Sequence, residues 1–263
     1  MKKKQLIFAI AVSLLSTATL ADDDDKDCPV TYDQLTTALS NAVAAGNGQF
    51  PLDMWATVVN KNGRVCQVTK TGAELNHQWL ASRAISAQKA YTSVSLSNNS
   101  NSLVGTSVSF TSAGLYLASV PGGPLYGLQH SNPVDTESAY DGKSKKFGTK
   151  KDPMRGRYVG GLNVFGGGLA LFDAAGKVIG GVGVSGNTSC ADHNIAWRVR
   201  GEFAALGIAQ GALFEFGIDY EGGYPNCGND VDISGVDDVW EAIGQNTDGS
   251  VIYNPGTHIN QLF

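Results

Sequence analysis

Charge, histidine and cysteine are all scarce in this sequence of 263 residues. Only 16% of the residues are charged, and the chain has four histidines and four cysteines. No Cys-x-x-Cys pair occurs, which argues against a zinc site of the usual spacing, and the lack of Cys-x-x-Cys-His excludes covalent attachment of a c-type haem. Neither G-x-S-x-G nor H-E-x-x-H is present. The sequence therefore shows no serine-hydrolase or zinc-protease signature.

Long apolar runs are also missing after the N-terminus, so we expect no membrane span. The chain begins with three lysines, an apolar stretch over 6–15 and the small-residue pattern Thr19-Leu20-Ala21. This order predicts a cleavable secretory signal over residues 1–21 and a periplasmic or secreted product. Loss of its three lysines changes the formal charge from -5 to -8. A net acidic protein argues against nucleic acid as a partner.

The remainder is predicted to be one domain with additions. Residues 22–27 are an acidic leader in which Asp22 to Lys26 equals the enteropeptidase recognition sequence, so they are either an engineered processing tag or a native segment. We expect the domain over residues 28–207, with a long inserted loop at 97–157 and a C-terminal extension at 208–263 packed on the same domain. The basic clusters at 143–151 and 155–157 lie in that loop and are predicted to be solvated.

Four cysteines in an exported chain predict disulfides. They are Cys28, Cys66, Cys190 and Cys227, and they allow three connectivities, among which the sequence alone does not choose. We favour Cys28 to Cys66 and Cys190 to Cys227, because these pairs are nearest along the chain.

Three helices and two hairpins are predicted. Thr31 and Gln34 form a capping box for a helix that ends near Gly46. Helical periodicity also covers residues 76–96 and 189–206. Strands are expected at 55–59, 64–69, 159–165, 168–172 and 177–185, the first two joined by an Asn-Gly turn. Because the strands come as hairpins, we expect an antiparallel sheet with helices on its faces, an α+β fold.

The segment Gly181 to Gly186 fits the pattern G-x-G-x-x-G. That pattern indicates a dinucleotide site when it follows the first strand of a βαβ unit. Here the strand is the return arm of a hairpin, and no parallel strand with an acidic residue follows. We favour the alternative, in which the glycines let a helix or a ligand approach the strand backbone closely.

Two histidines are candidate ligands for a metal or cofactor. His130 lies in a loop rich in turn-forming residues, where Tyr126 and Gln129 could converge with it on a ligand. His193 lies in the first turn of the third helix, where the helix dipole lowers the pKa of a histidine and keeps it neutral. The turn at 185–189 favours an anion, or it only caps that helix through Thr188 or Ser189. A structural, hydrogen-bonded role is the alternative for each histidine.

Several segments resemble a known family. They are Leu35 to Val43, Ala56 to Arg64, the helix containing Lys89-Ala90-Tyr91-Thr92, and the glycine-rich stretches 166–169 and 180–186. Together they resemble the GlcG/HbpS family of haem-binding and haem-degrading-like domains. The resemblance implies a profilin-like fold, in which helices flank a five-stranded antiparallel sheet. It also implies assembly into homo-oligomers, as dimers or larger, and non-covalent binding of haem.

The haem ligand of this chain is expected to differ from that of its relatives. In family members a histidine near the N-terminal helix is associated with the iron, but residues 28–50 contain none. His130 and His193 are therefore the expected iron ligands. The pocket is expected between the Gly166 to Gly168 turn, the Gln129-His130 loop and the start of the third helix. Its other lining residues would be Tyr126, Asn132, Phe165, Gly167 and Ser185.

Three functions remain open on the sequence. The favoured one is an exported small-molecule binding protein for haem or a related tetrapyrrole. The second is a periplasmic enzyme that acts on haem or a small carboxylate, with His130 or His193 as general acid or base. The third is a structural or sensory module that contacts an envelope partner.

Overall fold

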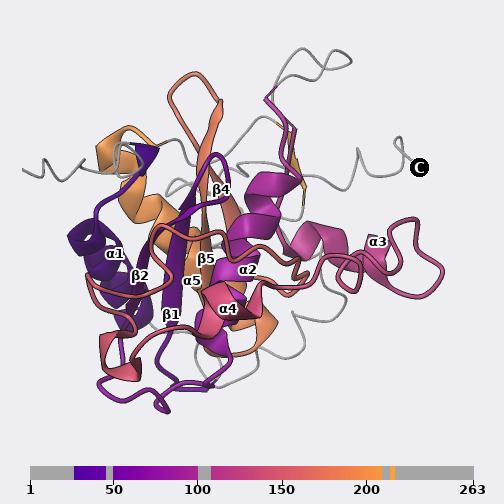
Figure 1. Ribbon diagram of the computed structural model, residues 1–263. Coiled ribbons are helices and arrows are strands. Elements are labelled where there is room, and N and C mark those ends of the chain that lie inside the picture. The colour runs from indigo at the N-terminus through magenta and orange to yellow at the C-terminus, as the bar shows by residue number, and fades with distance from the viewer. Residues whose placement is uncertain (1–26, 46–49, 100–107, 209–213, 217–263) are drawn as a thin grey trace, which may run out of the picture.

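A four-stranded antiparallel sheet forms the centre of the computed structural model, which describes residues 27–45, 50–99, 108–208 and 214–216. The strands are β1 (Trp55–Asn60), β2 (Val65–Lys70), β4 (Gly168–Phe172) and β5 (Val178–Ser185), in the spatial order β2-β1-β5-β4. Figure 1 shows α2 on the near face of the sheet, with α5 behind it and α1 beside β2. The α+β class predicted from the hairpins is confirmed.

Helices cover both faces of this sheet because its strands are apolar on both sides. One core joins α1 (Tyr32–Ala44) and α5 (Ser189–Glu202) to alternate residues of β1 and β5, such as Val58 and Val182. The other core joins α2 (Ser82–Ser95) to the opposite side chains, such as Val59 and Val178. A three-layer arrangement results, with the sheet in the middle.

Local signals in the sequence fix the first helix and the hairpins. The capping box is present, since the Thr31 hydroxyl accepts from the Gln34 amide and the Gln34 side chain accepts from the Thr31 amide. In the β1–β2 turn Gly63 has a φ of 83°, which favours glycine. In the β4–β5 turn the Asp173 side chain accepts from the amides of Ala175 and Lys177. These predictions are confirmed.

Glycines in β5 let α2 lie directly on the strand. A Cβ atom on Gly183 would lie 1.9 Å from the Ser86 carbonyl oxygen, and one on Gly181 would lie 2.6 Å from the Ala90 carbonyl oxygen. Both obstacles are helix backbone, which cannot rotate aside as a side chain can. The predicted alternative for the G-x-G-x-x-G segment, close approach of a helix, therefore accounts for these two glycines.

Replacing Gly183 with alanine should lower the free energy of unfolding by about 3 kcal/mol, because α2 must move away from the sheet to admit the methyl group. Urea denaturation followed by circular dichroism measures the change. Gly122→Ala is the control, since Gly122 has a φ of 88° and no atom within 4 Å of an added Cβ. The control should lose only about 1 kcal/mol from backbone strain. Equal losses would contradict the close-approach explanation.

The predicted strand from Val159 to Phe165 is wrong. Gly160 and Gly161 have φ angles of 61° and 76°, which interrupt an extended backbone. Beyond them, side chains take the place of a neighbouring strand: the Asn163 amide donates to Thr92 Oγ1 at 2.9 Å and the Val164 amide to Gln129 Oε1 at 3.1 Å. Within the described residues the main sheet thus has four strands, where the resemblance implied five.

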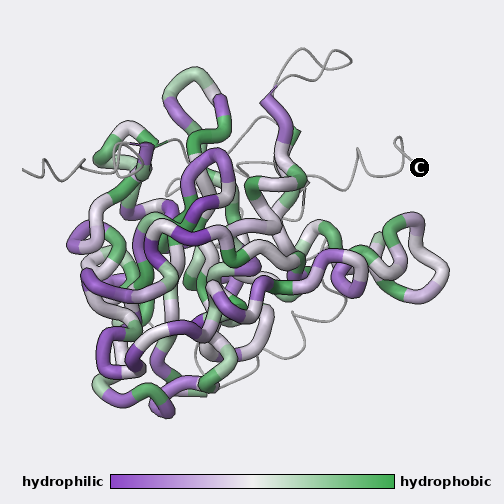
Figure 2. The backbone as a smooth tube through the Cα atoms, in the orientation of Figure 1, coloured by the Kyte–Doolittle hydropathy of each residue, from purple (hydrophilic) through white to green (hydrophobic). Residues whose placement is uncertain are grey.

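The predicted loop at 97–157 contains short elements. They are β3 (Val108–Phe110), the 3₁₀ helices at Ala113–Leu115 and Ser144–Lys146, α3 (Tyr116–Ser119) and α4 (Thr136–Tyr140). β3 pairs in parallel with β6 (Phe214–Phe216), and a 3₁₀ turn at Phe203–Leu206 follows α5. The second predicted helix starts later than expected, at Ser82. Figure 2 shows apolar stretches along the segment around α3, which projects from the body at the right.

The Cys28–Cys66 disulfide is confirmed, with a Cα–Cα distance of 5.6 Å. No described cysteine is a free thiol. Cys227, the partner predicted for Cys190, lies outside the described residues, as do the predicted signal peptide and most of the C-terminal extension. In the part of the chain that the structure describes, no helix has the length and apolar character needed to cross a membrane.

Candidate functional site

A buried ion pair lies where β5 ends and α5 begins. Lys89 Nζ is 2.6 Å from Asp192 Oδ2, and both side chains are almost fully buried. The ammonium group also donates to the Val184 carbonyl at 3.1 Å and to Ser185 Oγ at 3.3 Å. Three acceptors thus surround one cation, so each of its protons has a partner.

The turn before α5 holds the carboxylate in place. Asp192 Oδ1 accepts from the Asn187 amide at 2.9 Å, and Oδ2 accepts from Ser185 Oγ at 3.4 Å. The Thr188 hydroxyl caps the helix by accepting from the Ala191 amide. Of the two predicted caps, Thr188 and Ser189, the structure has the first. Asp192 therefore sits in the first helical turn, where the helix dipole stabilises a negative charge.

Burial shifts both members of the pair toward their neutral forms. It raises the pKa of the Asp192 carboxyl from 3.8 to about 6, against the opposing effects of Lys89, Asn187 and Ser185. It lowers the pKa of Lys89, although Asp192 acts in the other direction. Asp192 is thus a carboxyl group that titrates within one or two pH units of neutrality, which is typical of functional sites.

A carbon-13 NMR titration of the Asp192 carboxyl should show a midpoint near pH 6. Because the folded pKa lies above the ordinary value of 3.8, folding takes up a proton between these pH values. The contribution of Asp192 to stability is then full below about pH 4 and declines as the pH rises through 6. Ser185→Ala should raise the midpoint further, since it removes a hydrogen bond to the carboxylate. A midpoint below 4.5 in the wild type would contradict this description.

The structure brings His193 and Gly167 together beside this pair. The Gly167 amide donates to His193 Nδ1 at 3.1 Å, and the imidazole is buried. An Nδ1 that accepts places the proton of the neutral ring on Nε2. Gly167 has a φ of 115°, and a Cβ atom there would lie 2.4 Å from the Val184 carbonyl oxygen. His193 therefore anchors the turn before β4, while its role as an iron ligand stays a prediction.

The predicted loop does lie beside the neighbouring segment. Gln129 Oε1 accepts from the Val164 amide, and the Asn132 carbonyl accepts from the Leu162 amide at 3.0 Å. His130 itself is exposed and stands on the outside of this loop. The loop and the Gly167–His193 turn are thus connected through the 162–167 segment, with His130 on the solvent side and His193 inside.

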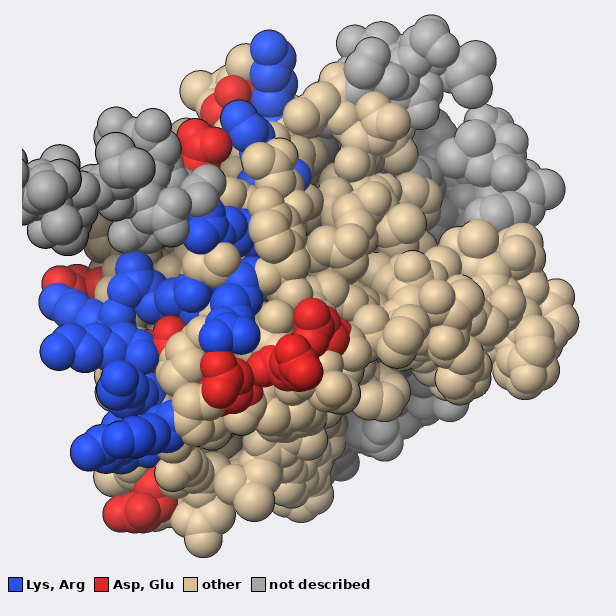
Figure 3. Space-filling model, in the orientation of Figure 1, with Lys and Arg blue, Asp and Glu red and all other residues tan. Residues whose placement is uncertain are grey.

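His130 lies in a long segment without charged residues. The chain has no Asp, Glu, Lys or Arg between Ala90 and Val134, and Figure 3 shows the region around α3, at the right, free of both signs of charge. Large apolar side chains are exposed on this segment and on the neighbouring turn, namely Leu117, Leu125, Tyr126 and Phe165. Tyr126 is 63% exposed and Phe165 is 46% exposed. We call this set with His130 the apolar loop surface.

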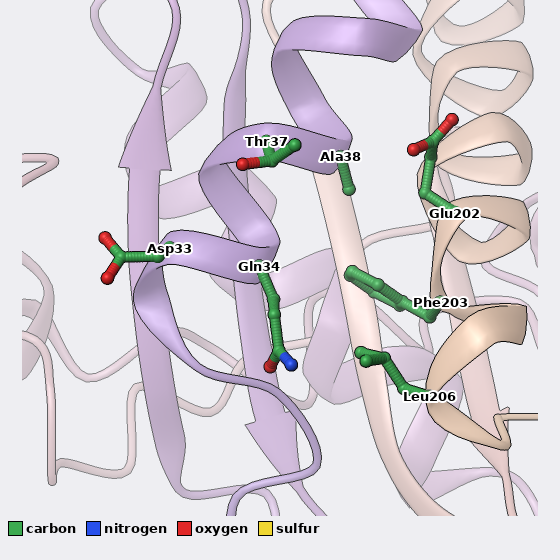
Figure 4. Close-up of a pocket in the computed structure, with 7 residues that line it drawn as sticks. All are labelled: Asp33, Gln34, Thr37, Ala38, Glu202, Phe203 and Leu206. Atoms are coloured by element: carbon green, nitrogen blue, oxygen red, sulfur yellow. The ribbon is translucent and has the colours of Figure 1, made fainter.

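A hollow lies between α1 and the end of α5. Its volume is about 290 Å³, and its lining residues are Asp33, Gln34, Thr37, Ala38, Glu202, Phe203 and Leu206. Figure 4 shows Phe203 and Leu206 facing α1 across the gap, with Asp33 pointing away. This volume is at the lower limit for small-molecule sites, and Glu202 at its rim disfavours an anionic ligand. No pattern in the sequence predicted this pocket.

A family model described as "Haem degrading protein HbpS-like" matches residues 30–199. The chain belongs to this family. The family resemblance carried by the sequence segments is thereby confirmed. No curated protein matches this HbpS-like chain.

Solved structures similar to the HbpS-like chain were found at low identity. Protein ORFY of Klebsiella pneumoniae is 23% identical, with a TM-score of 0.42, covering 67% of this chain and 91% of that one. A PduOC complex with haem is 20% identical, with a TM-score of 0.43, and the match covers 69% of this chain and 98% of that one. An HbpS double mutant from Streptomyces reticuli is 18% identical, with a TM-score of 0.35, and the match covers 78% of this chain and 99% of that one.

The Lys89–Asp192 pair was missed at the sequence level. Its members are 103 positions apart, and Lys89 lies in a helix whose apolar periodicity gives no reason to expect a buried cation. The one available signal was the Lys89-Ala90-Tyr91-Thr92 segment that carries part of the resemblance to the HbpS-like family.

Proposed function

We propose that this HbpS-like protein is exported and binds haem or a related tetrapyrrole without a covalent bond. The observation that carries the proposal is the match of the haem-degrading HbpS-like family over residues 30–199. The PduOC:haem complex among the similar structures supports the same class of ligand. Assembly into dimers or larger homo-oligomers belongs to the proposal, and native mass spectrometry of the purified protein tests it.

The residues of the apolar loop surface fit such a ligand. A haem offers a broad apolar face to the protein, and its iron takes one or two protein ligands, often the imidazole of histidine. Leu125, Tyr126 and Phe165 present exposed apolar area, and His130 presents an accessible imidazole. His193 is buried, and its Nδ1 already accepts from Gly167. We therefore assign the iron ligand to His130 first and to His193 second.

A bound haem would supply a redox-active iron at this surface. The chain's own contribution would be to bind and orient it. Gln129 holds the loop on the 162–165 segment. No group of three or more His, Cys, Asp and Glu that could hold a metal ion occurs among the described residues. Haem iron needs only one or two protein ligands, so this donor set suits it better than a bare ion.

Export is supported by the signal-like N-terminus and by the Cys28–Cys66 disulfide. Disulfides persist mainly in oxidising compartments, such as the periplasm or the extracellular space. N-terminal sequencing of the protein recovered from the periplasm or medium should begin at Asp22.

Haemin titration of the purified protein should give a saturable Soret shift that His130→Ala weakens by about tenfold or more. His77→Ala is the matched control, because His77 is also exposed but lies next to Asp53, away from the loop. His193→Gln tests the second ligand while keeping an acceptor for the Gly167 amide. A wild type without a Soret shift would contradict the function. A shift that survives in both the His130 and His193 variants would contradict the site.

An enzyme acting on haem or a small carboxylate is the second candidate. The observation that favours it is the near-neutral pKa of the buried Asp192 carboxyl, a value suited to proton transfer. Bleaching of the bound-haemin spectrum under ascorbate and oxygen, lost in Asp192→Asn, would support turnover. A spectrum that stays constant for hours would leave binding as the function.

A further inference from the structure

Cationic side chains gather on one surface beside the edge strand β2. We call it the basic surface, and its members are Lys61, Arg64, Lys143, Lys145, Lys146, Lys150, Lys151, Arg155 and Arg157. The lysines among them are all exposed. Figure 3 shows Lys and Arg side chains clustered over the left half of the molecule, on the side of α1 and β2.

Backbone contacts fix the loop that carries most of these cations. The Val65 amide donates to the Arg157 carbonyl at 2.9 Å, and the Gly156 amide donates to the Val65 carbonyl at 2.8 Å. Arg155 Nε donates to the Cys66 carbonyl at 2.8 Å. These hydrogen bonds hold the segment against the edge strand β2. The sequence predicted that these cations are solvated, but it did not predict that they lie on the same surface as Lys61 and Arg64 of the β1–β2 hairpin.

Acidic partners within the described chain are few on this surface. Asp33 pairs with Lys150 at 2.8 Å, and Asp141 pairs with Arg157. Elsewhere on it, four exposed lysines form no ion pair within the described residues: Lys143, Lys145, Lys146 and Lys151. The surface thus keeps an excess of positive charge, although the whole chain has a formal charge of -5.

Apart from the four aspartates at 22–25, most of the compensating negative charge lies at the C-terminal end of the sequence. No Lys or Arg follows Arg200. In contrast, residues 217–263 contain eight acidic residues, namely Asp219, Glu221, Asp230, Asp232, Asp237, Asp238, Glu241 and Asp248. The acidity of this protein is therefore concentrated in its terminal segments, and the described body is basic.

We propose that the acidic C-terminal segment 217–263 docks on the basic surface of its own chain. The segment follows β6, and a fully extended chain from Phe216 to Asp237 spans up to about 70 Å, more than the diameter of a domain of this size. The predicted Cys190–Cys227 disulfide would shorten the path, since Asp237 lies ten positions after Cys227. The occupant and its surface belong to one chain, which gives them a high effective concentration.

Zero-length carbodiimide coupling, which joins carboxylates to lysine amines, tests the contact in the full-length exported protein. Mass spectrometry should find links from the segment's acidic residues to Lys143, Lys145, Lys146 and Lys151. Their yield should fall about tenfold in 1 M NaCl, because exposed pairs are screened there. Lys177 is the internal control, since it is exposed in the β4–β5 turn outside the basic surface. Equal linking of Lys177 would overturn the proposal.

Heparin chromatography gives an independent test with an external polyanion as the probe. A variant with the eight acidic residues changed to their amides should elute at clearly higher salt than the wild type. That difference should vanish when the five lysines at 143, 145, 146, 150 and 151 are also changed to Gln, and it should remain when only Lys177 is changed. A wild type that already binds heparin as tightly as the amide variant would overturn the proposal and indicate a polyanionic partner from outside the chain.

Discussion

Replacing Lys89 with methionine should lower the free energy of unfolding by about 3 to 5 kcal/mol. The methionine keeps most of the apolar stem but removes the cation that opposes the effect of burial on the Asp192 pKa, which is already raised to about 6. The carboxyl must then take up a proton at pH 7 or remain a buried unpaired charge, and Ser185 and Asn187 provide only neutral donors. Urea denaturation at pH 7, followed by tryptophan fluorescence, measures the change.

Two variants separate this effect from general damage. Lys150→Met removes the cation of an exposed pair, with side chains 61% and 73% accessible, and should cost less than about 1 kcal/mol. Lys89→Met combined with Asp192→Asn removes both charges and keeps an acceptor for the Asn187 amide. It should recover about half of the loss. A cost for Lys89→Met no greater than that for Lys150→Met would contradict a buried, interdependent pair.

Removing the Cys28–Cys66 disulfide, by changing both cysteines to alanine, should cost about 4 kcal/mol. The bond closes a loop with a sequence separation of 38, and the estimate follows from the chain entropy that the unfolded state regains. The bond also fastens the residues before α1 to the edge strand β2, so these should become accessible first. Urea denaturation measures the loss, and limited proteolysis should locate new cleavage before Tyr32.

Dithiothreitol should lower the free energy of unfolding of the wild type toward that of this double variant. Cys190→Ala serves as the control, because it leaves the Cys28–Cys66 bond intact and should keep most of its sensitivity to reductant. If the double variant stays within 1 kcal/mol of the oxidised wild type, the bond does not contribute as described.

Local chemistry made much of the fold predictable. Thr31 and Gln34 satisfy each other's backbone within one turn, and Gly63 and Gly176 occupy turn positions with positive φ. The pairing of Cys28 with Cys66 was also anticipated from nearness along the chain. Such signals depend on residues close in sequence, so one sequence is enough to find them.

The errors arose where distant residues decide the structure. Val159 to Phe165 has the β-branched and aromatic composition of a strand, but several of its amides bond to distant single groups, including the side chains of Thr92 and Gln129. The Lys89–Asp192 pair likewise depends on a contact that no local pattern reveals. Of the predicted site, the structure brings Gly167 to His193 and Gln129 to the 162–165 segment, while the ligand role of each histidine stays a prediction.

The ion pair has a mechanical consequence for the architecture. Lys89 belongs to α2 on one face of the sheet, and Asp192 belongs to α5 on the other. A sheet normally separates the helices on its two sides, so that a movement of one layer need not reach the other. Here a single lysine side chain passes the end of β5 and fastens the layers together. Because Gly181 and Gly183 set how closely α2 approaches, a displacement of that helix would pull on the first turn of α5 through this pair.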